Sequence, residues 1–213
     1  MSNAKTVIIA SNNAHKAEEI AHALDFPGWE FRTLKEAHID SDPAEDADSF
    51  LGNARIKAKA AWEAAKETLG HPVAVLADDS GLEVDALGGE PGVYSARYSG
   101  EGATDEKNNK KLLAALAGVP DEKRTARFRT IVTCIFPDGD EIQAEGVCEG
   151  RILESPRGQD GFGYDPLFWY EPLGKTFAEL TPDEKNAVSH RGRAMREFAA
   201  KLRAHGIGDQ KSC

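Results

Sequence analysis

The sequence has few cysteines and no long apolar run, and both shortages exclude classes of protein. Its three cysteines, Cys134, Cys148 and Cys213, are an odd set without metal-ligand spacing, which argues against a disulfide framework and against a zinc site. No stretch approaches the roughly 18 to 20 apolar residues that a membrane helix needs. The first residues, MSNAKTVIIASNN, lack the apolar core of a signal peptide. We therefore expect a protein of the reducing cytoplasm, with no membrane partner.

Basic residues are also fewer than acidic residues. The chain has 26 basic and 36 acidic residues, and its net charge is -10. An excess of this sign repels a phosphate backbone, so we expect no nucleic-acid partner. One small anionic ligand in a local basic pocket remains compatible with this charge.

Residue patterning predicts a single α/β domain. There is no internal repeat and no long linker, so one domain of two lobes is expected over residues 1–213, with a frayed tail over 203–213. Apolar and β-branched runs predict strands over 5–10, 29–34, 73–77, 126–136 and 140–150, the last two as a hairpin. Capping signals and periodicity predict helices over 15–24, 49–69, 104–117 and 189–205, with a further helix start at Thr181. Early alternation of strands and helices followed by a hairpin indicates a mixed sheet.

Two strand ends carry candidate site residues. SNNAHK, from Ser11 to Lys16, lies at a strand-to-helix junction, where backbone N–H groups and a lysine favour an anion. The alternative is a capping Asn with a solvated Lys. Asp78 and Asp79 follow a buried strand and are costly there unless a cation such as Mg²⁺ neutralises them. Successive strand residues face opposite ways, which leaves open whether both reach the metal. An Asp-rich turn is the competing interpretation.

An acidic loop over 36–48, which includes Glu45, precedes the long helix predicted from 49. Asn53 and Lys57 share a face of that helix and can present an amide and an ammonium to one ligand. A solvated loop and a surface lysine are the alternative.

Two later segments complete the candidates. GQDGFGYDPLF, residues 158–168, combines glycines that admit a ligand with aromatic rings that can stack on a base; a turn covering the core is the alternative. EKNAVSHRGRA, residues 184–194, is a local basic patch that suits a phosphate or a base edge. It can also be an ordinary Arg-rich helix start, although cations there oppose the helix dipole.

In this order, the motifs resemble the inosine triphosphate pyrophosphatase family. The resemblance runs from Val7 to Leu202 and includes SNNAHK, SFLGNARIKAKAA, LADDSGLEVDALGGEPGVYSARYSG, GQDGFGYDPLF and ELTPDEKNAVSHRGRA. It implies Mg²⁺-dependent hydrolysis of inosine, deoxyinosine and xanthosine triphosphates to the monophosphate and pyrophosphate. It also implies a homodimer, and a long curved mixed sheet flanked by helices, with the nucleotide in a cleft between two lobes.

The resemblance also implies roles for individual residues. Asp79 resembles the catalytic acid–base and metal-binding carboxylate. The implied triphosphate-side residues are Ser11, Asn12, Asn13, Lys16, Lys57 and Ser80. The implied base- and sugar-side residues are Phe162, Gly163, Tyr164, Asp165, Lys185, His190 and Arg191. The implied metal ligands are Asp79, Asp78 and Glu45.

The sequence departs from the family pattern in the acidic loop. The family usually has Glu-x-Gly shortly before the Phe that matches Phe50, and here the glycine position is Ala47. Alignment without gaps places Glu45 at the ligand position, and Asp46 or Asp48 could substitute for it.

The resulting hypothesis is that Asp79 deprotonates a water that attacks the α-phosphorus. Lys16, Lys57 and Mg²⁺ would neutralise the phosphates. Donors that include Arg191 and backbone N–H groups near Phe162 would select a 6-oxo purine. Three alternatives stay open: a related pyrophosphatase for other nucleotides such as modified pyrimidines, a nucleotide-binding regulatory module without catalysis, and a Mg²⁺-dependent kinase. The kinase lacks support because no kinase signature is present.

Overall fold

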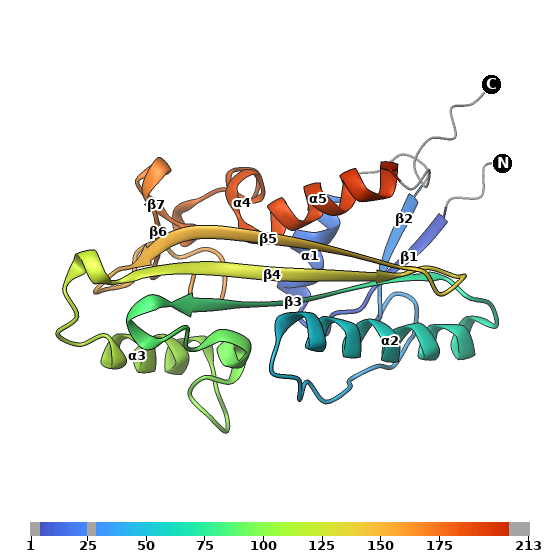
Figure 1. The fold of residues 1–213 in the computed structure, drawn as a ribbon, viewed down its shortest axis with the longest axis horizontal. Helices are drawn as coiled ribbons and strands as arrows, with labels where there is room; N and C mark the ends of the chain where they lie inside the picture. The colour runs from blue at the N-terminus through green and yellow to red at the C-terminus, as the bar shows by residue number, and fades with distance from the viewer. Residues whose placement is uncertain (1–4, 25–28, 205–213) are drawn as a thin grey trace. The chain divides into compact units, whose positions relative to one another are not determined.

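A computed structural model describes residues 5–24 and 29–204 (Figure 1). Its strands are β1 (Lys5–Ile9), β2 (Trp29–Thr33), β3 (Ala74–Val84), β4 (Thr125–Ile135), β5 (Glu141–Ile152), β6 (Phe168–Tyr170) and β7 (Lys175–Thr176). Its α-helices are α1 (Ala14–Ala23), α2 (Phe50–Leu69), α3 (Asp105–Ala115), α4 (Pro182–Val188) and α5 (His190–Ala204). Short 3₁₀ turns are η1 (Asp85–Leu87), η2 (Gly92–Arg97), η3 (Asp121–Lys123), η4 (Glu171–Leu173) and η5 (Phe177–Glu179). Within these ranges no helix is long and apolar enough to cross a membrane.

The strands form one mixed sheet in the order β2-β1-β3-β4-β5-β6-β7. β1 pairs in parallel with β2 and with β3, and Ile8 lies opposite Val75. β6 pairs antiparallel with β5 and with β7, and Ile152 lies opposite Phe168. The predicted α/β class with a mixed sheet is confirmed. The predicted cleft between two lobes stays a prediction.

Helix boundaries follow the local capping signals closely. α2 begins after Ser49, whose Oγ accepts the Gly52 N–H at 3.2 Å, and it ends at Leu69, followed by Gly70 with a left-handed φ of 72°. α4 begins after Thr181, with Pro182 at its first position and Glu184 closing a reciprocal capping box. Caps of this kind satisfy the N–H and C=O groups that a helix end leaves unpaired, and they depend only on nearby residues.

The structure differs from the sequence prediction at several element boundaries and in two short strands. β3 continues to Val84, past the predicted end at residue 77, because tertiary cations neutralise the two aspartates on it. The helix predicted to residue 117 ends at Ala115. β6 and β7 were not predicted, since strands of three and two residues carry almost no periodic signal. Of the predicted frayed tail, residues 203 and 204 lie in α5, and 205–213 fall outside the described residues.

The contacts divide the chain into two compact units. The first contains Met1–Asp79, Thr130–Gly146 and Arg191–Cys213, and the second contains Ser80–Arg129 and Val147–His190. In the first unit α2 packs on one face of the strands, and α1 and α5 pack on the other (Figure 1). Alternation along the strands explains this, because Ile8 and Val75 belong to the α2 side while Val7 and Leu76 belong to the α1 and α5 side.

The second unit has its own aromatic core. Phe128 lies 4.6 Å from Phe168 and 5.7 Å from Phe177, measured between ring centroids. The His190 ring stacks on Phe128 at 4.7 Å. These contacts, together with Leu112 of α3 and Leu116 directly after it, hold the elements of this unit around the segment 158–168.

Candidate active site

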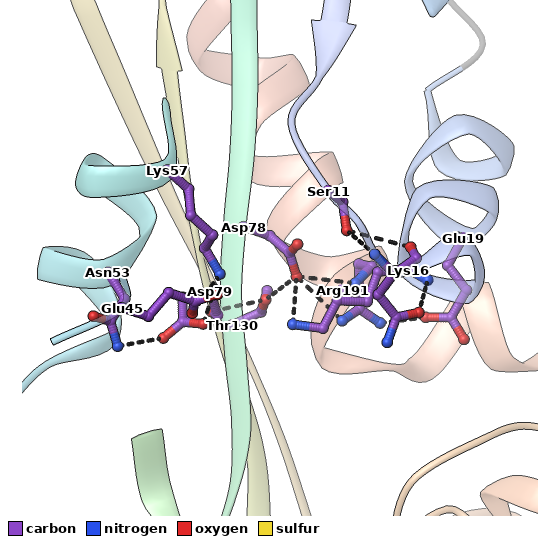
Figure 2. A network of polar contacts seen from close by, with 11 residues as sticks. Ser11, Lys16, Glu19, Glu45, Asn53, Lys57, Asp78, Asp79, Thr130 and Arg191 are labelled. Atoms are coloured by element: carbon purple, nitrogen blue, oxygen red, sulfur yellow. Dashed lines mark hydrogen bonds and ion pairs between the residues drawn. The ribbon is translucent and has the colours of Figure 1, made fainter. Parts of the chain in front are cut away.

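Asp78 and Asp79 are neighbours on β3 and both are buried, at 2% and 5% exposure. Because alternate strand residues face opposite ways, their carboxylates point to opposite sides of β3 (Figure 2). Each carboxylate meets its own set of cations within the first unit. Asp78 and Asp79 therefore form two separate sites, each with its own cationic partners.

Asp78 is the centre of a buried ion-pair network. Its Oδ2 atom lies 3.2 Å from Nη2 of Arg191 and 3.8 Å from Nζ of Lys16, and it accepts the Thr130 hydroxyl at 3.4 Å. Arg191 also pairs with Glu19 on α1. Burial by itself would raise the pKa of Asp78, but Lys16 and Arg191 outweigh it and hold that pKa well below its usual range. Asp78 is therefore a permanent anion that neutralises two cations.

Asp79 faces α2 and the acidic loop. Its Oδ1 atom accepts a hydrogen bond from Nζ of Lys57 at 2.9 Å, and its Oδ2 atom accepts one from Nδ2 of Asn53 at 3.3 Å. The same Lys57 ammonium reaches Oε2 of Glu45 at 3.0 Å. Burial raises the pKa of Asp79 above its usual range, although Lys57 opposes the shift. A carboxylate with a raised pKa is a better proton acceptor, so Asp79 suits a general base.

Glu45 and Asp79 place two oxygen ligands around one cationic position. Mg²⁺ in proteins is commonly held by one or two carboxylates together with substrate phosphates and water, and this donor set fits that pattern. Within the part of the chain that the structure describes, no group of three or more Asp, Glu, His or Cys side chains gathers in a way that could hold a metal. Asp78, the third expected ligand, points to the other side of β3.

The turn between β1 and α1 is built by its own polar side chains. Asn13 caps α1, with Oδ1 accepting the Lys16 N–H at 3.2 Å, and Ser11 Oγ accepts the Asn13 N–H at 3.2 Å. Asn12 donates to Ser41 O at 3.1 Å, which ties the turn to the acidic loop. Burial lowers the pKa of Lys16 even though Asp78 partly restores it. The turn thus presents a helix N-terminus beside a lysine, the arrangement that favours an anion.

In the second unit, Asp165 organises the glycine-rich segment. Its Oδ2 atom accepts the Phe162 N–H at 2.9 Å and Nζ of Lys185 at 2.5 Å. The Lys185 ammonium also lies over the Phe162 ring, 4.9 Å from its centroid. Gly161 is required here, because a Cβ at this position would lie 2.3 Å from the Asp165 carboxylate. The segment is a pinned turn that carries a partly buried Phe162 ring.

Two residues of α3 also hold this turn, and sequence reasoning missed both. Asp105 Oδ2 accepts the Gly163 N–H at 2.6 Å, and Asn109 Nδ2 donates to Gly163 O at 2.9 Å. Tyr164 is buried and its hydroxyl donates to Ser95 O at 2.8 Å, which leaves Phe162 as the better candidate for stacking on a base. In the sequence, Asp105 and Asn109 are indistinguishable from ordinary polar residues of a helix surface.

The expected site residues divide between the two units. The first unit contains Ser11, Asn12, Asn13, Lys16, Glu45, Lys57, Asp78, Asp79 and Arg191. The second contains Ser80, Phe162, Gly163, Tyr164, Asp165, Lys185 and His190. Arg191 was grouped with Lys185 and His190 on the sequence, but its guanidinium pairs with Asp78 and Glu19 of its own unit. Glu19 and Thr130 join the network as partners that the motifs do not identify, whereas Asn53, which the sequence placed on one helix face with Lys57, contacts Asp79 together with it.

Comparison with known proteins matches nearly the whole chain. The Ham1 family profile matches residues 7–201. A dITP/XTP pyrophosphatase from Clostridium perfringens is 47% identical over 199 residues, which cover 93% of this chain and 98% of that protein. The solved structure of the Staphylococcus aureus Ham1 protein is 39% identical, with a TM-score of 0.79 over 94% of this chain and 100% of that chain. A Mycobacterium abscessus nucleoside-triphosphatase / dITP/XTP pyrophosphatase is 43% identical, with a TM-score of 0.69 over 92% and 98%. The family that the motifs indicated is confirmed, and the chain belongs to the Ham1 family.

Proposed function

We propose that this protein is a nucleoside triphosphate pyrophosphatase that converts ITP, dITP and XTP to the monophosphate and pyrophosphate. The names of its relatives support this reaction class. The observation that carries the proposal is the cluster of Asp79, Lys57 and Glu45, in which a buried carboxylate with a raised pKa shares one ammonium with a second carboxylate. A buried general base beside a cation is what the hydrolysis of an anionic substrate requires.

Asp79 acts in this proposal as the base that takes a proton from the attacking water. Lys57 holds Oδ1 of Asp79 at 2.9 Å and Asn53 holds Oδ2 at 3.3 Å, so the carboxylate is fixed in one orientation. Attack at the α-phosphorus then releases pyrophosphate. Lys16, at the start of α1, balances charge on the phosphates, and Asp78 keeps Lys16 and Arg191 in place.

We propose that Glu45 and Asp79 hold the Mg²⁺ ion. When bound, this ion neutralises phosphate oxygens and makes pyrophosphate a better leaving group. Both carboxylates contact the Lys57 ammonium, and two carboxylates this close to one cationic group support the proposal that they act together on a cation.

On the base side, Phe162 supplies a ring for stacking, and Lys185 and Asp165 fix that ring. The backbone N–H groups of Phe162 and Gly163 donate to Asp165 and Asp105, so they are poor candidates for reading the purine O6. Arg191 stays the proposed O6 donor on the strength of the family resemblance alone, because its guanidinium is also paired, with Asp78 and Glu19. A donor at this position bonds a 6-oxo purine and opposes the 6-amino group of adenine, and such mismatches can reject a substrate by about 10⁴.

Three further properties are part of the proposal: Mg²⁺ dependence, a homodimer, and a cytoplasmic location. Light scattering during size-exclusion chromatography tests the dimer. Fractionation of cells that express the tagged protein tests the location.

The decisive experiment measures pyrophosphate and orthophosphate release from ITP and ATP, with and without Mg²⁺. Strong Mg²⁺-dependent release of pyrophosphate from ITP alone is expected, and it should disappear in the Asp79→Asn variant. Orthophosphate release, or equal use of ITP and ATP, contradicts the proposal. A preference for modified pyrimidine triphosphates in the same assay would favour a related pyrophosphatase. Binding without hydrolysis would favour a regulatory module.

A further inference from the structure

The acidic loop, residues 36–48, contains no regular helix or strand from residue 39 onward, yet it carries Glu45 to the Lys57 ammonium. Something must fix its position, because an unsupported loop would not hold a carboxylate at 3.0 Å from a buried lysine. Two contacts join the end of this loop to the first turn of α2: the packing of Ala47 on Gly52, and a hydrogen bond from Ala47 to Asn53.

Gly52 lies in the third position of α2, where glycine costs helix stability relative to alanine. The space around it explains the glycine. A Cβ at position 52 would lie 2.5 Å from the Cβ of Ala47 and 3.1 Å from Oγ of Ser49, the helix cap. Carbon atoms in contact normally lie about 3.5 to 4.0 Å apart. Any side chain at 52 would therefore displace Ala47 by about 1 Å or more.

Asn53 links Ala47 to the Asp79 carboxylate. Its side chain is fully buried, at 0% exposure. Its Oδ1 atom accepts the Ala47 N–H at 3.0 Å, and its Nδ2 atom donates to Asp79 Oδ2 at 3.3 Å. One amide thus joins the loop backbone to Asp79, and Lys57, one turn later on α2, joins Asp79 to Glu45 (Figure 2).

We propose that Gly52 and Asn53 are positioning residues that set the acidic loop, and with it Glu45, against Asp79. Gly52 lets Ala47 approach the first turn of α2, and Asn53 locks that approach to the Asp79 carboxylate. The absence of a side chain at position 52 leaves room for the Ala47 methyl group. The inference rests on the proposed function, in which Glu45 and Asp79 act together.

The test is a double-mutant cycle of Gly52→Ala and Ala47→Gly. Gly52→Ala alone should lower kcat/KM for ITP by about 10- to 100-fold, the effect expected of a displacement near 1 Å, and raise the Mg²⁺ concentration for half-maximal rate. It should also lower Tm in EDTA, although alanine is the better helix former. Ala47→Gly alone should stay within about threefold of wild type in rate, and the double variant should return to that level.

Asn53→Asp provides a second line of evidence. It replaces the donor to Asp79 with an acceptor, so it should also lower kcat/KM and raise the Mg²⁺ requirement. Adding Ala47→Gly should not rescue it, because Asn53→Asp loses a hydrogen bond and creates no steric clash that a smaller residue 47 could relieve.

Each outcome decides the inference. A Gly52→Ala variant with unchanged Tm and Mg²⁺ requirement overturns it, and so does an impaired variant that Ala47→Gly fails to rescue. If Gly52→Ala does not fold, a folded double variant supports the proposal and an unfolded one overturns it. If the wild type hydrolyses no nucleotide, the proposed function fails, while the Tm cycle in EDTA still tests the contact.

Discussion

Replacing Asp78 with Asn should destabilise the fold far more than the same change at Asp79. Asp78 is 2% exposed and its Oδ2 atom is shared by Arg191, Lys16 and Thr130. Asparagine keeps the shape but removes the charge that balances two cations. Removing one partner of a buried ion pair costs about 3 to 5 kcal/mol. In a protein of this length each kcal/mol shifts Tm by about 2 to 4 °C, so Tm should fall by roughly 6 to 20 °C.

Asp79→Asn is the matched control, one residue along the same strand. Burial raises the pKa of Asp79, which means that its ionised form is less favourable in the folded chain than in the unfolded chain. Removing this charge therefore relieves a cost while it disturbs the contacts with Lys57 and Asn53. We expect the free energy of unfolding to change by about 1 kcal/mol or less, while turnover falls by about 10²- to 10⁴-fold with the loss of the base.

Urea unfolding and differential scanning calorimetry near pH 7 measure the two stabilities, and pyrophosphate release from ITP measures the two rates. The expected pattern is an unstable Asp78→Asn and a stable but inactive Asp79→Asn. Equal losses of stability in both variants would refute the assignment of the two aspartates to separate cation sets. A stable Asp78→Asn would show that Arg191 and Lys16 do not depend on it.

Three further predictions concern single side chains. Lys57→Met leaves the two carboxylates it bridges without their shared ammonium, so ITP hydrolysis should fall at least about 100-fold; a near-normal rate would remove Lys57 from the mechanism. Arg124→Met removes charged donors from three backbone carbonyls at 2.8 to 3.0 Å, two of them buried and one partly buried, so urea unfolding should show a loss of about 3 kcal/mol or more, with unchanged activity per folded molecule. Phe162→Ala should raise KM for ITP by about 5- to 150-fold, since base stacking contributes about 1 to 3 kcal/mol, and an unchanged KM would place stacking elsewhere.

Local signals explain why much of the fold could be predicted. α2 is bounded by Ser49 and Gly70, and α4 starts with the cap of Thr181, Pro182 and Glu184. Each of these caps joins residues only a few positions apart in the chain. The end of β3 could not be predicted in this way. In the sequence alone, Asp78 and Asp79 fit an Asp-rich turn as well as a site at the end of a strand. They lie within β3 because the cations that neutralise them come from distant segments.

The same distinction applies to the site. The motifs singled out Lys16, Lys57 and Asp79 as candidates, because charged residue types at strand ends and on one helix face are visible in sequence. They did not indicate that the two aspartates have separate partners, or that Arg191 reaches Asp78 across 113 residues of chain.

The sequence by itself therefore determined the family, the α/β class, the helix caps and the residue types available for chemistry. These depend on residues that are close together in the chain or on motif identity. Only the tertiary structure decided which cation each carboxylate meets, how the acidic loop reaches Lys57, and why position 52 is glycine. Those outcomes depend on burial and on contacts between segments far apart in sequence, since the free energy of a buried charge is set by whatever the fold places around it.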